Sequence, residues 1–137
     1  MGRYITRTDV EAVFGVDNVA TWSNLENTQA SANEDRIDAA IARAEGCIDD
    51  RFRGGTYAVP LSNLGDASSA VVKDWASNLA GAWLFESRGL RDDDPTAHRM
   101  AERRRRIDRE MVEYLSGQRR LDAARATTGP GAPSVIC

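Results

Sequence analysis

Hydrophobic residues recur at helical spacing through most of this chain, and the clearest series precedes Gly54. Its members are separated by three or four positions: Ile37, Ile41, Ala44, Ile48 and Phe52. Because each helical residue turns by about 100°, these side chains share one face about 80° wide. Asp49 and Asp50 lie off that face. The pattern predicts an amphipathic helix that begins after a Ser31–Glu34 capping box and ends at Gly54-Gly55.

A second long helix is predicted from about Ala70 to Ser87, with Ser68 or Ser69 as its cap. One apolar stripe consists of Val72, Trp75, Ala76, Leu79, Ala82 and Trp83. Leu84 and Phe85 fall outside this stripe, so the helix is apolar nearly all round. Such a helix is usually central in its domain or faces a second protein. We therefore consider Leu84 and Phe85 as candidate subunit contacts.

A third long helix is predicted to begin at Pro95 and to end near Ser116. Aspartates 92–94 precede the proline, as suits the positive end of a helix dipole. Met100, Ile107 and Met111 mark its buried side, and Gly117 follows it.

Shorter elements are predicted on either side of the first long helix. Thr8 to Glu11 reads as a capping box for a short helix that ends at Gly15, and a second short helix covers about 16–25. Residues 26–32 read as a polar loop, and residues 56–61 as an extended connector around Pro60.

The fold class predicted from these elements is all-α. We expect a small helical bundle with two long central helices, a basic C-terminal helix and a flexible C-terminal tail. The domain is expected to cover residues 1–122 and the tail residues 123–137, where the helical periodicity is lost.

The overall composition is ordinary, but the charge is distributed unevenly along the chain. The 137 residues carry a net charge of −3, with 42% hydrophobic and 28% charged residues, as in ordinary globular domains. Residues 1–94 hold nine basic and sixteen acidic side chains, whereas residues 95–137 hold nine and five. This polarity of −7 and +4 favours an interaction role, and the net value argues against a dedicated nucleic-acid binder.

Candidate chemistry is sparse. His98 is the only histidine, and Cys47 and Cys137 are too few for a disulfide framework. No metal-ligand spacing, cofactor motif or catalytic pair is evident, so we expect neither an enzyme nor a bound cofactor. The longest apolar run is far shorter than the ~20 residues of a membrane span.

The run Arg103–Arg106 is the sharpest local feature. Basic clusters attract phosphates, but four consecutive helical residues sweep about 300° and cannot form one stripe. With Ile107 at the centre of the buried face, Arg103 and Arg104 flank it and Arg105 points away. Three readings stay open: a solvated or subunit-bridging face, a contact with a partner protein, and direct nucleic-acid binding.

The ordered set of motifs resembles the small all-α head–tail joining proteins of tailed bacteriophages, in particular the Mu-like prophage group. The matching segments are Tyr4–Val10 with Phe14-Gly15, the helix Ile37–Phe52, the connector Tyr57–Leu61, the Trp-containing helix and the Arg-rich last helix. They span about residues 4–122. Thr56 stands where relatives have arginine, and the tail is longer than usual.

This resemblance implies a structural role in the virion. Such adaptors form a ring of roughly twelve subunits beneath the portal, offer a platform to a stopper or tail-terminator protein, and pass DNA through the lumen. They are made in the host cytoplasm and need no membrane. Candidate interface residues are Leu84, Phe85, Arg103, Arg105 and Arg106. Pro133, Val135 and Ile136 are candidates for docking on the portal. The alternative is a nucleic-acid-binding regulatory protein that uses the last helix.

Overall fold

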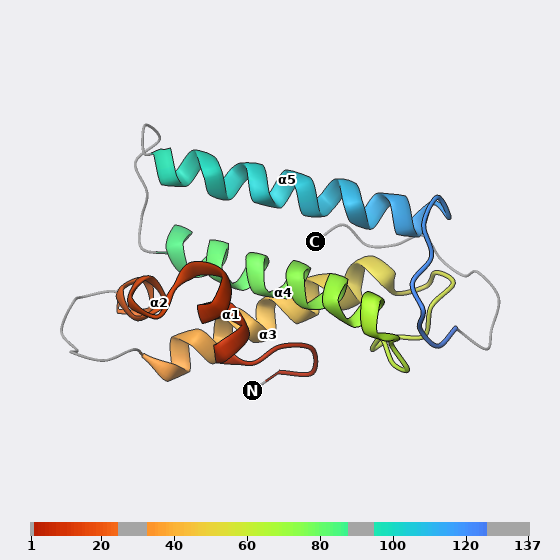
Figure 1. Ribbon diagram of the computed structural model, residues 1–137, viewed down its shortest axis with the longest axis horizontal. Helices are drawn as coiled ribbons and strands as arrows, with labels where there is room; N and C mark the ends of the chain where they lie inside the picture. The colour runs from red at the N-terminus through yellow and green to blue at the C-terminus, as the bar shows by residue number, and fades with distance from the viewer. Residues whose placement is uncertain (1, 25–32, 88–94, 126–137) are drawn as a thin grey trace.

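The computed structural model describes residues 2–24, 33–87 and 95–125. Within these ranges the chain forms five α-helices and no strand, so the all-α prediction is confirmed. The helices, in chain order, are α1 (Arg7–Phe14), α2 (Val16–Ser23), α3 (Glu34–Phe52), α4 (Asp66–Glu86) and α5 (Pro95–Leu115). The two short helices lie at one end of the long ones (Figure 1).

Helix α4 is the central element and contacts each of the other four helices. Figure 1 shows α5 along one side of α4 and α3 along another. The ring of Trp75 lies in the middle of this packing, stacked on Phe52 of α3 at 5.9 Å and edge-on to Tyr114 of α5 at 5.3 Å. This position explains why α4 is apolar nearly all round, because almost every face of it is buried in the subunit.

Helix α3 has the predicted apolar face, since Ile37, Ile41, Ala44, Ile48 and Phe52 are all buried. Its cap differs from the prediction. Asn33 is the N-cap, and its side chain accepts a hydrogen bond from the Arg36 amide at 3.3 Å. Ser31 lies outside the described residues.

Helix α1 begins earlier than predicted. Thr6 is its N-cap, and the Thr6 amide donates to the Asp9 carboxylate at 2.8 Å. Glu11 does not close a capping box with Thr8, because its carboxylate pairs instead with Arg7 at 3.1 Å. The predicted stop at Gly15 is confirmed: this glycine has a positive φ of 94° and separates α1 from α2.

Helix α4 begins after Gly65, four residues before the predicted start. Neither Ser68 nor Ser69 is its cap, because both lie inside the first turns. The Ser68 hydroxyl is instead buried and accepts a hydrogen bond from the amide of Asp122 at 2.8 Å. Helix α5 begins at Pro95 as predicted.

The segment after α5 returns along the domain. Leu121 is buried, and its amide donates to the Tyr57 hydroxyl at 2.8 Å. The backbone of Ala124 bonds to Ser62 and Ala58, at 2.8 and 2.9 Å. Residues 123–125 therefore belong with the helical domain rather than with the predicted tail. The rest of that tail, including Pro133, Val135 and Ile136, lies outside the described residues.

No helix in the described part of the chain has the length and apolar character needed to cross a membrane.

Candidate functional site

The arginines of α5 face two different environments. Arg103, Arg104 and Arg106 are partly buried, and Arg105 is exposed. Ile107, at the centre of the predicted buried face, is fully buried. The predicted rotation of the run around the helix is therefore confirmed.

Three of these arginines bind side chains of α4. Arg103 donates to Oδ1 of Asn78 at 2.5 Å and places its guanidinium 5.0 Å from the ring centre of Phe14. Arg104 makes two hydrogen bonds to the Glu86 carboxylate, at 2.9 and 2.6 Å. These contacts tie α5 to α4, as suits a partly buried arginine that needs hydrogen-bond partners.

Arg106 lies between two carboxylates. Its Nη1 is 3.1 Å from Asp74 of α4 and 2.8 Å from Glu110 one turn further along α5. Burial acts to lower the pKa of Arg106, but the hydrogen bonds and charges of Asp74 and Glu110 outweigh it and raise the pKa. The positive charges of Arg104 and Arg106 are thus compensated by carboxylates of the same subunit, which weakens the electrostatic field that this helix offers to phosphates.

Arg105 has a different surrounding. Among the described residues its ion-pair partner is Glu102 on its own helix, and the Arg105 side chain is 61% exposed. Arg109 and Val112 follow at four and seven positions and are also exposed. Because seven residues make nearly two turns, these three side chains share the outward face of α5. We call Arg105, Arg109 and Val112 the α5 stripe.

A second exposed apolar site lies where α1 meets α2. Val13 is 38% exposed and Val16 is 59% exposed, and the exposed Asp17 adjoins them. We call Val13, Val16 and Asp17 the α1–α2 corner. Single exposed valines are ordinary on protein surfaces. The corner is distinguished by two of them beside an acidic residue, opposite in charge to the α5 stripe.

Leu84 and Phe85 are engaged within the subunit. Leu84 is fully buried and has no surface left for a neighbour, so it is a core residue. Phe85 is half-buried and packs edge-on against Trp22 of α2, with ring centres 5.2 Å apart. Phe85 lies off the main stripe of α4 because it contacts α2, whereas Trp75 of the stripe contacts α3 and α5.

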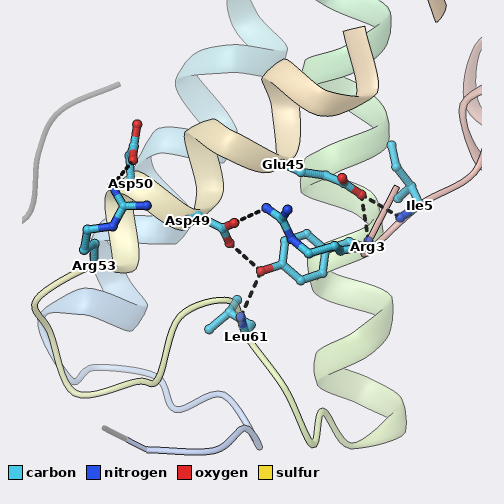
Figure 2. Close-up of polar contacts among 8 residues, drawn as sticks. Arg3, Ile5, Glu45, Asp49, Asp50, Arg53 and Leu61 are labelled. Carbon is cyan, nitrogen blue, oxygen red and sulfur yellow. Dashed lines mark hydrogen bonds and ion pairs between the residues drawn. The ribbon is translucent and has the colours of Figure 1, made fainter. Parts of the chain in front are cut away.

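A buried polar cluster joins the N-terminal segment to α3, and sequence reasoning missed it (Figure 2). Asp49 is 5% exposed and accepts hydrogen bonds from the Arg3 guanidinium and the Tyr4 hydroxyl. One turn earlier, Glu45 Oε2 accepts from the amides of Tyr4 at 2.7 Å and Ile5 at 3.2 Å.

The cluster continues into the connector. The Tyr4 oxygen accepts a hydrogen bond from the Leu61 amide at 2.9 Å. Burial, with the hydrogen bond to Asp49 as a second cause, raises the pKa of Tyr4. These buried polar groups are hydrogen-bonded to one another, so the cluster has a structural role. We call it the clamp, because it holds the N-terminal segment, α3 and the connector together. The sequence signal was a pair of acids at i and i+4, Glu45 and Asp49, beside the apolar face.

In the described ranges, no three His, Cys, Asp or Glu side chains gather so as to hold a metal ion. His98 is exposed in the first turns of α5. The exposed large hydrophobic side chains of the described residues, Val13, Val16 and Val112, lie in the α1–α2 corner and the α5 stripe.

Comparison with known proteins gives one family. The family model described as "Bacteriophage Mu, Gp36" matches residues 4–134, nearly the whole chain. No curated protein and no solved structure matches.

Proposed function

The chain belongs to the bacteriophage Mu Gp36 family, and from this premise we propose that it is a head–tail adaptor of the virion. In this role it forms a ring between the portal and the tail or stopper protein, and DNA passes through the lumen as cargo. The protein is made in the bacterial host cytoplasm and acts as a structural subunit rather than as an enzyme.

The observation that carries this proposal is the pair of unlike exposed sites on one subunit. A closed ring needs a heterologous contact, in which one surface of each subunit meets a different surface of the next. The α5 stripe offers Val112 with two arginines, and the α1–α2 corner offers two valines with Asp17. Valine against valine and arginine near aspartate make the two sites complementary.

Contacts within the subunit already engage two other arginines of this run. Arg103 and Arg106 bind Asn78 and Asp74 of α4, so they fix α5 against α4 on the side away from the α5 stripe. Arg105 remains the candidate of this run that faces a neighbouring subunit. Phe85 supports the α1–α2 corner indirectly. Its ring packs against Trp22, which in turn packs against Phe14 near that corner.

The test is assembly of the full chain with its cognate portal protein, followed by co-sedimentation and electron microscopy. The wild type is expected to add a ring to the portal. Val16→Asp and Val112→Asp should each reduce incorporation at least tenfold, because each buries a charge in the contact between subunits. Gln118→Asp, which places the same charge at another exposed position, should assemble like the wild type. Equal incorporation of all variants would contradict this assignment of the contact.

The ion pairs of Arg104 and Arg106 also argue against the alternative function, nucleic-acid binding by α5. A helix that bound phosphates through Arg103–Arg106 would show duplex binding that falls steeply with salt. We expect no such binding by the isolated chain at low salt in fluorescence anisotropy. Tight binding that is abolished by neutralising these four arginines would favour the alternative.

A further inference from the structure

The chain returns along the domain after α5, where residues 121–125 lie across the connector that precedes α4 (Figure 1). Leu121 is the only buried residue of these five, whereas Asp122 and Arg125 are exposed. We call residues 121–125 the strap, and we call residues 57–68, which bind it, the strap site. Because one leucine is a small anchor, we expect the strap to separate from the domain more easily than a helix does.

Two hydroxyl groups of the strap site hold the first half of the strap. The Tyr57 hydroxyl accepts a hydrogen bond from the Leu121 amide, and the Ser68 hydroxyl accepts one from the Asp122 amide, both at 2.8 Å. Tyr57 and Ser68 are buried, and among the described residues neither hydroxyl has a second hydrogen-bond partner. A buried hydroxyl without any partner is costly. The strap site therefore needs an occupant whenever its own strap is absent.

The second half of the strap is held by bonds between main-chain groups. The Ala124 amide donates to the Ser62 carbonyl oxygen at 2.8 Å, and the Ala124 carbonyl oxygen accepts from the Ala58 amide at 2.9 Å. The Gly65 amide donates to the Asp122 carbonyl oxygen at 2.9 Å. Every one of these bonds uses a main-chain group of the strap, as when an extended peptide is added to an exposed edge. The strap site thus recognises an extended backbone with a leucine anchor.

The turn between α5 and the strap is held loosely. Residues 116–120 are all exposed, and Gly117 within them has a positive φ of 86°. Arg119 ties this turn to α5, because its amide donates to the Glu113 carbonyl oxygen at 3.1 Å and its Nε lies 2.8 Å from the Glu113 carboxylate. Both side chains of this ion pair are at least one-third exposed, so the pair contributes little. Five extended residues span up to ~17 Å, which lets the strap reach an adjacent subunit when the turn opens.

We propose that the strap site also binds the strap of a second copy of this chain, so that subunits exchange residues 121–125. The contacts between subunits are then the same as those within one subunit, which makes the exchange of an element inexpensive once copies are close together. In the dilute subunit the strap binds its own site, because the covalent link keeps it near. This inference goes beyond the proposed function and does not depend on it, since its tests use the isolated full chain.

Refolding tests the exchange. Full-length protein is refolded from urea at low and at high protein concentration, and size-exclusion chromatography with light scattering measures the oligomers. The oligomeric fraction of the wild type should rise with the concentration during refolding. Leu121→Asp should give about tenfold less oligomer, because the exchanged contact would bury its carboxylate. Wild-type protein that is monomeric at every concentration, or equal oligomer formation by Leu121→Asp, would overturn the proposal.

Val112→Asp is the matched control for Leu121→Asp. It places the same charge in the α5 stripe, which belongs to the proposed ring contact and not to the strap site. Refolded Val112→Asp should therefore form oligomers like the wild type, even though it is expected to fail on the portal. Oligomers that are lost in Val112→Asp and kept in Leu121→Asp would belong to the α5 stripe and would overturn the exchange.

A second measurement uses only the wild-type chain, so it does not depend on how well a variant folds. The probe is a peptide of residues 119–125 with both ends blocked, added in excess during refolding at high concentration. By occupying the strap site it should lower the oligomeric fraction. The same peptide with Leu121→Asp lacks the apolar anchor and should leave that fraction unchanged. Equal effects of the two peptides, or no effect of either, would overturn the proposal.

Discussion

Tyr4 donates its hydroxyl hydrogen to the buried carboxylate of Asp49, which lies 45 positions further along the chain. The same phenol oxygen accepts the amide hydrogen of Leu61 at 2.9 Å. One side chain therefore ties the N-terminal segment to α3 and to the connector before α4 (Figure 2).

Removing this hydroxyl should destabilise the subunit. Tyr4→Phe leaves the Leu61 amide and one oxygen of Asp49 without a partner, at a cost of about 1–3 kcal/mol in the free energy of unfolding. Urea denaturation measures this change. Tyr114→Phe is the matched control, because the Tyr114 hydroxyl makes no hydrogen bond within the described part of the chain. Equal stability of the two variants would show that the clamp contributes nothing.

The clamp should also weaken at high pH. The phenol is neutral when protonated, and burial raises the pKa of Tyr4 in the folded state. Its contribution is therefore complete below the unfolded-state pKa of about 10 and decreases as the pH rises above that value. The decrease has an upper limit of about 1.4 kcal/mol per pH unit.

Urea denaturation of the wild type and of Tyr4→Phe between pH 9 and 11 isolates this effect. The difference between their free energies of unfolding should shrink as the pH increases. A difference that stays constant over this range would contradict the assignment.

Gly81 of α4 allows α1 to pack close to α4, because it has no side chain where Phe14 lies. A Cβ atom built on Gly81 would lie 2.0 Å from Cε2 of Phe14, far inside van der Waals contact. The Phe14 ring is held between Trp22 and the Arg103 guanidinium, so it has little room to move. Gly81→Ala should therefore destabilise the subunit by about 1–3 kcal/mol.

Gly46→Ala is the matched control for this substitution. A Cβ atom on this glycine of α3 meets nothing within 4 Å, so alanine should stabilise the helix by about 0.5–1 kcal/mol. Thermal or urea unfolding of both variants would give opposite signs. A destabilised Gly46→Ala together with an unaffected Gly81→Ala would refute this packing.

The ion pair between Arg104 and Glu86 should couple more strongly than the one between Arg105 and Glu102. The first pair is bidentate, joins two helices and is about one-third exposed, whereas the second is local and mostly exposed. Double-mutant cycles with glutamine at each position should give about 0.5–1 kcal/mol for the first pair and near zero for the second. A larger coupling energy in the second pair would contradict the division of α5 into a side that binds α4 and a side that faces outward.

The long helices could be predicted because their apolar periodicity is imposed by one buried face. Ile37 to Phe52 on α3 and Met100 to Met111 on α5 are cases in which local pattern and tertiary packing agree. The helix starts were predicted less well. Several residues suited to capping stand close together, as Ser31 and Asn33 do, and the sequence alone does not rank them.

Buried polar groups were the main omission. The helical pattern placed Asp49 off the apolar face and gave no sign that its side chain is buried. Its partners, Arg3 and Tyr4, are more than 40 residues away in sequence, so nothing local reveals the burial. Leu84 was placed at a possible contact between subunits for a related reason, since a helix surrounded by four others has no single apolar stripe.

The most direct test of the proposed role is the number of copies of this chain that a single portal assembly binds. Native mass spectrometry of the wild-type complex gives that number, and electron microscopy shows its arrangement. The adaptor role predicts a closed ring of roughly twelve copies on one face of the portal. Binding of single subunits, or no binding to the portal, would contradict it.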